Sequence, residues 1–256
     1  MQMSDPIPMQ VERAALRAFP ALEEAGLNGW LLRFANGQSR RDNSVQTLSH
    51  SGVVASDVAA AEAWYGKRGI PGTFRMTPMS QPAGLDSELE AAAYRRQDPT
   101  SVQTLHLAGK GLAANERIEI TDSPTSTWFD IIMESSRYMA GRRPTLEQTL
   151  RMIEPQTAFA LLREAGRPVA TGLAVADGDL VGLFSIAVLP QFRRAGYGRA
   201  MSESLLGWGR AAGASIAYLQ VMHVNTPALD LYRSMGFEPL YDYWYRSLAD
   251  RPPMVG

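Results

Sequence analysis

Three arginines and two glycines lie together in one short turn, PQFRRAGYGRAM. The arginines are Arg193, Arg194 and Arg199, and the glycines are Gly196 and Gly198. A helix start presents unpaired backbone N–H groups and a positive dipole end, and glycines leave the approach to them open. Guanidinium groups add charge-assisted hydrogen bonds. The turn therefore predicts a site for an anion such as a pyrophosphate, and a solvated Gly-rich connection is the alternative interpretation.

Two common phosphate-binding loops do not fit this turn. The pattern G-x-x-x-x-G-K-[ST] of nucleoside triphosphatases is missing from the sequence. Met201 stands where the dinucleotide-binding fingerprint requires a third small residue. These two families of phosphate-binding loop are therefore disfavoured.

The turn and a later segment together carry a family resemblance. Arg193-x-x-Gly196-x-Gly198 resembles the Q/R-x-x-G-x-G/A acyl-CoA motif of the GNAT acetyltransferase superfamily. NTPALDLYRSMGF, farther along the chain, resembles the motif N-x-x-A-x-x-L-Y-x-x-x-G-F of the same superfamily. The residues that match this second motif are Asn225, Ala228, Leu231, Tyr232, Gly236 and Phe237. The resemblance covers residues 116–248.

The resemblance implies that acetyl-CoA is the cosubstrate. Backbone N–H groups of residues 194–199 would hold the pyrophosphate, and the exposed edge of the preceding strand would pair with the pantetheine arm. Asn225 would lie near the same arm. The cofactor-binding residues that it implies are Ile186, Ala187, Val188, Arg193, Arg194, Ala195, Gly196, Tyr197, Gly198, Arg199, Ala200 and Asn225.

Tyr232 has two interpretations. It shares one helical face with Ala228, Leu231 and Met235, which is typical of a core tyrosine. In the superfamily, the tyrosine of this motif acts as a general acid toward the departing thiolate. A phenol is protonated at neutral pH and can donate, so Tyr232 is our candidate catalytic residue.

The implied reaction is direct attack of an amine on the acetyl group, and the sequence does not reveal its general base. Backbone N–H groups near Val188 would stabilise the tetrahedral intermediate. His223 titrates in a useful range, but a lone histidine is more often structural. Asp130 and Glu134 lie on one face of a predicted helix, where they would either attract a cationic amine or simply form a solvated acidic face.

The composition of the chain argues against several classes of chemistry and of binding partner. The 256 residues contain no cysteine and three histidines, which argues against thiolate chemistry and a catalytic metal. The formal charge of −1 is not that of a general nucleic-acid binder. No stretch approaches a secretory signal or a membrane span, so we expect a cytoplasmic protein that associates with neither membranes nor nucleic acid.

The elements that position the motifs follow from patterning. The second half predicts a strand at 117–120, helices near 125–139 and 145–153, and a three-stranded antiparallel meander that ends before the turn. A helix begins after the turn, a buried strand follows at 215–222, and Thr226 is the expected cap of the next helix. The aromatic final strand fits either the interior of its own domain or a homodimer contact.

The first half predicts its own compact α/β unit. It contains a hairpin through Asn36-Gly37, a helix capped by Ser56, a strand at 73–77, a helix near 86–96 and a strand near 100–107. The Gly-rich segment at 107–115 predicts a boundary that separates a degenerate GNAT-like domain, 1–112, from a catalytic domain, 113–256.

The predicted fold class is therefore α/β, of the α+β type found in GNAT proteins. It has two tandem domains, each with a mixed, mostly antiparallel sheet flanked by helices. GWLLRFANGQSRRDNSV in the first domain also resembles the N-terminal part of some two-domain bacterial acetyltransferases. Arg33, Arg41 and Asn43 of this segment would either contact an acceptor or stabilise the hairpin.

The predicted function is N-acetyl transfer from acetyl-CoA to a primary amine, with a small molecule as the expected acceptor. A protein or peptide amine is the nearer alternative, and a non-catalytic acyl-CoA-binding sensor or scaffold is the more distant one. A nucleotide-binding interaction domain would leave the second motif unexplained.

Overall fold

A computed structural model describes residues 5–112, 115–136, 139 and 141–248 of the chain. The first half contributes α1 (Ile7–Ala18), β1 (Glu23–Leu27), β2 (Trp30–Phe34), β3 (Val45–Gln46), α2 (Val54–Gly66), β4 (Thr73–Met76), α3 (Leu85–Ala91) and β5 (Arg95–His106). The second half contributes β6 (Ile118–Thr121), α4 (Ser126–Ser135), α5 (Arg143–Arg151), β7 (Gln156–Glu164), β8 (Arg167–Asp177), β9 (Leu180–Val188), the short 3-10 helix Pro190–Phe192, α6 (Tyr197–Ala211), β10 (Ile216–Met222), α7 (Thr226–Met235) and β11 (Glu238–Ser247).

The predicted meander is confirmed, since β7, β8 and β9 pair antiparallel in chain order. In the first half, β2 and β3 pair antiparallel as predicted, but ten residues connect them. The tight hairpin is instead the one between β1 and β2, where Asn28 and Gly29 take positive φ angles of 46° and 91°. Helix α2 begins at Val54 with no side-chain cap, so Ser56 does not cap it. Helix α3 ends before Ala93, whose φ of 66° is left-handed.

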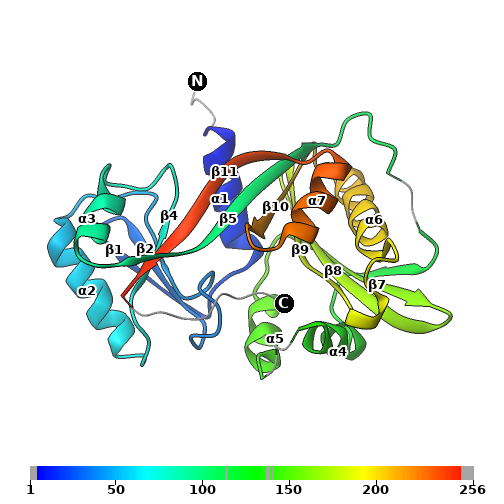
Figure 1. Ribbon diagram of the computed structural model, residues 1–256, viewed down its shortest axis with the longest axis horizontal. Helices are drawn as coiled ribbons and strands as arrows, with labels where there is room; N and C mark the ends of the chain where they lie inside the picture. The colour runs from blue at the N-terminus through cyan, green and yellow to red at the C-terminus, as the bar shows by residue number, and fades with distance from the viewer. Residues whose placement is uncertain (1–4, 113–114, 137–138, 140, 249–256) are drawn as a thin grey trace.

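The strands form one sheet in the order β1-β2-β3-β4-β11-β5-β10-β9-β8-β7-β6. The predicted pair of separate sheets is therefore not confirmed, although the sheet is mixed and mostly antiparallel. Figure 1 shows the reason: β5 and β11 are long and run side by side through the middle of the molecule. Strand β11 also pairs with β4, and β5 also pairs with β10, so the two halves share their central strands. The predicted boundary adjoins residues 113–114, which lie outside the described residues, and a division there stays a prediction.

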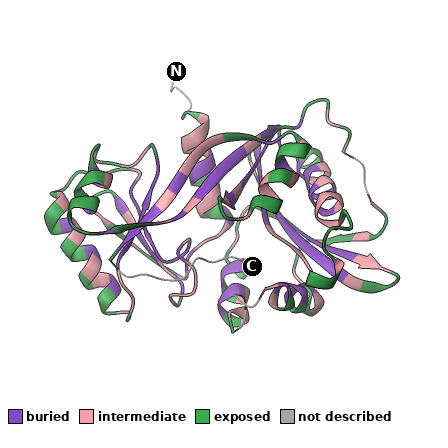
Figure 2. Cartoon of the chain, viewed as in Figure 1, coloured by how far each residue is buried: buried purple, intermediate pink, exposed green. Residues whose placement is uncertain are grey.

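The core follows the shared sheet rather than the predicted halves. Figure 2 shows buried residues along the strands and exposed residues on the outer faces of the helices. Val11, Ala14 and Ala18 of α1 are buried in the same cluster as Trp128 of α4 and Phe184 of β9. The first helix of the chain thus packs on the second half.

The aromatic final strand lies inside the molecule. Tyr243 and Tyr245 are each 3% exposed, with ring centroids 5.6 Å apart. On the opposite face, Trp244 Nε1 donates to Asp86 at 2.7 Å, and Arg246 forms an ion pair with the same carboxylate at 2.8 Å. The prediction of a homodimer is not tested by this arrangement. Across the part of the chain that the structure describes, no helix has the length and apolar composition that a membrane crossing requires.

Candidate active site

Two neighbouring parallel strands separate near the centre of the sheet. β9 and β10 pair only at their beginnings, and the last pair in register is Gly182 with Tyr218. Beyond it, β9 continues to Val188 and β10 to Met222, without pairing to each other. Backbone edges that diverge in this way leave hydrogen-bonding groups available to an extended ligand.

A bulge in β9 widens this gap. Ser185 has a φ of 50°, and the register with β8 shifts where Phe184 pairs with Leu173 and Ala187 pairs with Thr171. Gly172 lies opposite the bulge, where an added Cβ would be 2.7 Å from the Ile186 side chain. A glycine fits here because side chains of both β9 and α6 lie against it, with Leu205 of α6 also 2.7 Å from the added Cβ.

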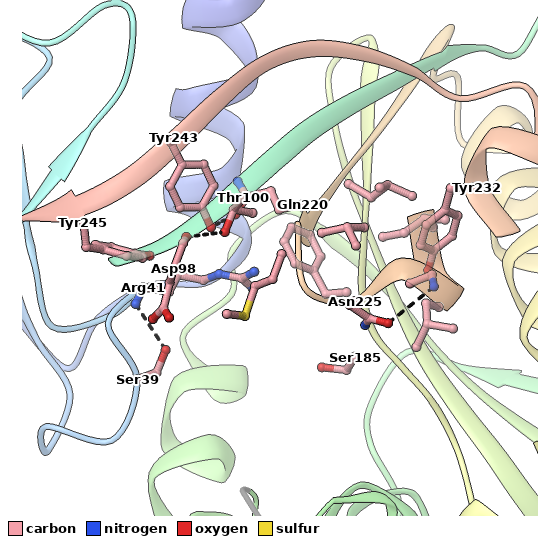
Figure 3. Close-up of a pocket in the computed structure, with 17 residues that line it drawn as sticks. Ser39, Arg41, Asp98, Thr100, Ser185, Gln220, Asn225, Tyr232, Tyr243 and Tyr245 are labelled. Atoms are coloured by element: carbon pink, nitrogen blue, oxygen red, sulfur yellow. Dashed lines mark hydrogen bonds between the residues drawn. The ribbon is translucent and has the colours of Figure 1, made fainter. Parts of the chain in front are cut away.

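The gap opens into a cleft of about 350 Å³. One wall comes from the end of β9, another from the end of β10, and a third from the start of α7 (Figure 3). Of the predicted site residues, Ile186, Asn225 and Tyr232 line the cleft. The remaining lining residues are Ser39, Arg41, Asp98, Thr100, Leu183, Phe184, Ser185, Leu219, Gln220, Val221, Met222, Ala228, Tyr243 and Tyr245.

Tyr232 is both a core residue and a cleft residue. It is 6% exposed, and its ring packs edge-on against Phe237 with centroids 5.5 Å apart. Burial raises the pKa of Tyr232 to about 12, against the lowering effect of a hydrogen bond with the Ser202 hydroxyl. The phenol therefore keeps its proton throughout the neutral range, as a proton donor requires.

The predicted anion turn forms the start of α6. Gly196 is the N-cap, with a left-handed φ of 81°, and an added Cβ there would point into open space. The first bond onto the cap runs from Ala200 N–H to Gly196 O at 3.1 Å, so the N–H groups of residues 194–199 precede it. This is the arrangement that anions bind at helix starts.

The three arginines of the turn differ in their contacts. Arg193 donates to the backbone oxygens of Ser135 at 2.9 Å and Val188 at 3.3 Å, and so holds the turn to α4 and β9. Arg199 contacts Ser234 of α7 at 2.5 Å. Arg194 is exposed, with a φ of 67°, and makes no hydrogen bond or ion pair with any described residue. Of these three arginines, Arg194 has all of its guanidinium donors available to a ligand.

The two motifs meet where the start of α6 packs against the second half of α7. An added Cβ on Gly198 would lie 3.4 Å from Leu231, so the helices touch at this glycine. Asn225, not Thr226, caps α7: its Oδ1 accepts from Ala228 N–H at 3.3 Å. Gly236 ends the helix with a φ of 90°, as its place in the motif predicts.

Comparison with known proteins decides the family. Residues 9–246 match the profile of the family described as "Probable histone acetyltransferase Rv0428c C-terminal". The chain belongs to this GNAT family. It is 28% identical to the uncharacterized N-acetyltransferase YobR of Bacillus subtilis over 93% of this chain and 97% of that protein. It is 27% identical to the probable histone acetyltransferase Rv0428c of Mycobacterium tuberculosis over 89% of this chain and 69% of that protein.

Solved structures share the GNAT fold. A GCN5-related N-acetyltransferase from Kribbella flavida aligns with a TM-score of 0.68 at 14% identity, over 95% of this chain and 96% of that one. A tandem GNAT protein from the clavulanic acid biosynthesis pathway aligns with a TM-score of 0.55 at 13% identity, over 77% of this chain and 70% of that one. The predicted superfamily is confirmed, and the chain is an acyltransferase of the GNAT type.

Three titratable candidates of this GNAT chain lie away from the cleft lining: His223, considered as a base, and the acidic pair Asp130 and Glu134, considered as a site for a cationic amine. His223 Nε2 pairs with Asp242 at 3.1 Å, and both side chains are 44% exposed. Asp130 forms an ion pair with Arg143 at 2.6 Å on the surface, and Glu134 is also exposed. These contacts favour the structural and solvated interpretations of all three residues.

The three candidates in the first half of the chain have different roles. Arg33 is 1% exposed and donates to Glu24 at 3.0 Å, so its role is structural. Asn43 holds the turn after β2 by accepting from Ala35 N–H at 2.7 Å. Arg41 alone of the three lines the cleft. The cluster SRRDNS was the sequence signal for this wall, but no periodicity in it distinguished Arg41 from its neighbours.

A second cavity of about 150 Å³ adjoins the cleft, because Ser39, Arg41 and Ser185 line both spaces. Asp42 also lines the second cavity and is 6% exposed. Its Oδ1 is buried without a hydrogen bond. Burial raises the pKa of Asp42 to about 6, although Arg33 and other arginines nearby lower it. Sequence reasoning missed this carboxylate.

Proposed function

We propose that this GNAT chain transfers the acetyl group of acetyl-CoA to a primary amine, and that the amine belongs to a small molecule. The observation that carries the proposal is the cleft between the separated strands β9 and β10, with Tyr232 in its wall. The pantetheine arm would add to the free edge of β9 as a peptide adds to a sheet.

The start of α6 fits the pyrophosphate of acetyl-CoA. Its N–H groups are exposed, Gly196 leaves their approach open, and Arg194 adds a free cation. The side chains of Arg193 and Arg199 would position the turn, because their guanidinium groups contact α4, β9 and α7, and the backbone N–H of Arg199 would still serve the pyrophosphate.

Tyr232 would act as the general acid. The amine nitrogen forms a bond to the acetyl carbon, and the C–S bond then breaks with its electron pair left on sulfur. The phenol, protonated below pH 12, gives its proton to that sulfur. Backbone N–H groups near Val188 would stabilise the oxyanion of the intermediate.

The small volume of the cavity where the acceptor would bind favours a small molecule. The space beyond Ser185 is a cavity of about 150 Å³ between the loop after β2 and α5. A protein amine remains the alternative, because relatives include a probable histone acetyltransferase and enzymes named for the ribosomal protein bS18 alanine.

Two measurements test the proposal. Calorimetry with acetyl-CoA and with ATP compares the two ligands, and binding of ATP alone would contradict acetyl-CoA as donor. Thiol release from acetyl-CoA is then followed across a panel of amines and peptides. If acetyl-CoA binds but every acceptor leaves thiol release at the hydrolysis background, the chain is a sensor rather than an enzyme.

We predict that Tyr232→Phe lowers kcat by about 100-fold, because the thiolate then leaves without a general acid. The affinity for acetyl-CoA, measured by calorimetry, should stay within about twofold of the wild type. Phe237→Leu is the matched control, since it changes the ring packed against Tyr232 and keeps the phenol. An unchanged kcat in Tyr232→Phe would remove the phenol from the mechanism.

A further inference from the structure

Arg41 reaches into the cleft without a polar partner. Its guanidinium lies 5.5 Å from the ring centroid of Phe19 and 5.7 Å from that of Phe184, and it makes no hydrogen bond or ion pair with a described residue. Neighbouring arginines differ: Arg40 forms an ion pair with Asp98. Arg41 is half-buried, and Asp42 is a carboxylate that acts on it through space without a hydrogen bond. The guanidinium N–H donors therefore lie in a partly desolvated site where a ligand can accept from them.

Arg41 lies on the acceptor side of the cleft. Figure 3 shows Arg41 and Tyr232 on opposite sides, with Gln220 and Asn225 between them. The turn that fits the pyrophosphate is not among the residues that line the cleft. Arg41 is therefore placed to meet an anion on the acceptor rather than the phosphates of the donor.

Asp42, the residue after Arg41, has a carboxylate oxygen without a hydrogen-bond donor. It is 6% exposed, lines the smaller cavity with Arg41, and buries an Oδ1 that no donor reaches among the described residues. A buried carboxylate oxygen of this kind is satisfied by an N–H donor, most strongly by a charged one. Arg41 and Asp42 thus face one space, which Arg142 also lines, and in it the Arg41 guanidinium lacks an acceptor while Asp42 Oδ1 lacks a donor.

We propose, building on the function proposed above, that the acceptor carries a carboxylate within a few bonds of its amine, as a free amino acid does, with the carboxylate bound by Arg41 and the ammonium by Asp42. A planar guanidinium matches a carboxylate through two parallel hydrogen bonds. The cavity of about 150 Å³ suits a molecule of this size and borders Ser185 at the bulge of β9.

Asp42 also completes the proton balance. The ammonium gives one proton to the Asp42 carboxylate, and the neutral amine attacks the acetyl carbon. The C–N bond forms, the C–S bond breaks, and Tyr232 protonates the sulfur. The second proton on nitrogen returns to the Tyr232 phenolate, and Asp42 releases its proton to solvent.

Matched acceptors test the carboxylate. The probes are free amino acids, including β- and γ-amino acids, each compared with its carboxamide in thiol release. The wild type should prefer the best free acid over its amide by at least about tenfold in kcat/KM. Arg41→Met should reduce this ratio to about one through KM, and Arg41→Lys should keep part of it.

Arg68→Met is the matched control, because Arg68 pairs with Glu23 away from both cavities and its loss should leave the preference intact. Asp42→Asn should lower turnover of every amine about tenfold at pH 7. The turnover of Asp42→Asn should rise toward the wild-type value at a pH above the pKa of the amine, because the amine is then already neutral. A purely structural Asp42 would show no such recovery.

The outcomes separate this inference from the proposed function. Equal use of acids and amides by the wild type, or an equal loss on both in Arg41→Met, overturns the inference and leaves acetyl transfer intact. If no amine is acetylated, the proposed function fails, and calorimetry of amino acids with the CoA-saturated protein decides instead. Binding of a free acid that Arg41→Met abolishes supports the inference, and the lack of any such binding overturns it.

Discussion

Single residues of the turn after β9 illustrate how one residue type can take two roles. Arg193 holds backbone oxygens of β9 and α4, whereas Arg194 projects from a left-handed backbone with its guanidinium free. Residue type alone cannot separate these roles, because both side chains carry the same charge. The neighbouring partners decide, and they are supplied by other elements.

Replacement of these two arginines should therefore have different effects. Arg194→Ala should weaken acetyl-CoA binding about fivefold, the loss of roughly 1 kcal/mol for one charge-assisted contact, with little change in stability. Arg193→Ala should lower the free energy of unfolding by about 1 kcal/mol, since two backbone acceptors lose their donor. Calorimetry and urea unfolding of both variants check this. Equal effects of both variants on binding would contradict the assignment.

The buried Asp42 should make stability depend on pH. Burial raises the pKa of Asp42 from 3.8 to about 6, so the folded state holds this proton more tightly than the unfolded state does. Its contribution to stability is fully present below pH 4 and is lost as pH rises through 6, by about 3 kcal/mol in total. Asp42→Asn should lack this decline when urea unfolding is compared at pH 4.5 and pH 7.5. Parallel pH dependences of the wild type and the variant would contradict the raised pKa.

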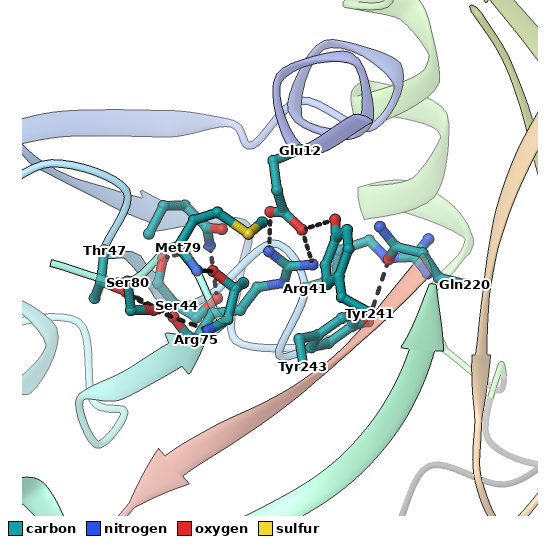
Figure 4. Close-up of polar contacts among 12 residues, drawn as sticks. Glu12, Arg41, Ser44, Thr47, Arg75, Met79, Ser80, Gln220, Tyr241 and Tyr243 are labelled. Carbon is teal, nitrogen blue, oxygen red and sulfur yellow. Dashed lines mark hydrogen bonds and ion pairs between the residues drawn. The ribbon is translucent and has the colours of Figure 1, made fainter. Parts of the chain in front are cut away.

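At the scale of elements, Glu12 fixes α1 to β4 by a buried ion pair with Arg75 and to β11 by a hydrogen bond from Tyr241. Figure 4 shows Glu12 of α1 between Arg75 of β4 and Tyr241 of β11. Arg75 Nη2 donates to Glu12 Oε1 at 2.9 Å, and its guanidinium lies 3.8 Å from the ring centroid of Tyr243. The helix thereby gains a defined position over a wall of the cleft.

Breaking this pair should be costly. Glu12→Gln leaves the Arg75 guanidinium buried without its counter-ion, and we expect the free energy of unfolding to fall by about 3 to 5 kcal/mol. Arg13→Gln is the control, because its partner Asp5 and its own side chain are largely exposed. Thermal or urea unfolding measures both, and a loss under about 1 kcal/mol in Glu12→Gln would show that the pair is not a main support of α1.

Local elements were more predictable from the sequence than their pairing. The meander and the bounds of α7 follow from turn residues and periodicity, which act over a few residues, whereas the motif of α7 came from the family resemblance. The cap of α7 was assigned one position late, since Asn225 and Thr226 are both good caps. Arg41 reaches the cleft, and Asp42 the smaller cavity beside it, because β11 and β5 bring the first half against the second, and no local pattern encodes such distant contacts.

At the scale of the whole molecule, the predicted halves share one sheet. β5 of the first half lies between β10 and β11 of the second, and β11 lies between β5 and β4. Neither half can satisfy the edges of its own strands alone. We therefore expect the chain to unfold as a single cooperative unit.

A fragment of residues 113–256 tests this expectation. It lacks β5 and α1, so β10 and β11 lose the strand between them and Trp128 loses part of its cover. The fragment should show no cooperative thermal transition by circular dichroism and no binding of acetyl-CoA by calorimetry. A cooperatively folded fragment that binds acetyl-CoA would instead establish the division at residue 112.

The central place of β11 has a consequence for biosynthesis. Strands β1 to β10 have all left the ribosome before β11 does, yet β11 belongs between β4 and β5. The nascent chain must keep those two strands apart, or release them, until their middle neighbour arrives. During that interval their open edges are exposed to other chains, so we expect yield in vivo to depend on chaperones and on the rate at which the last segment is translated.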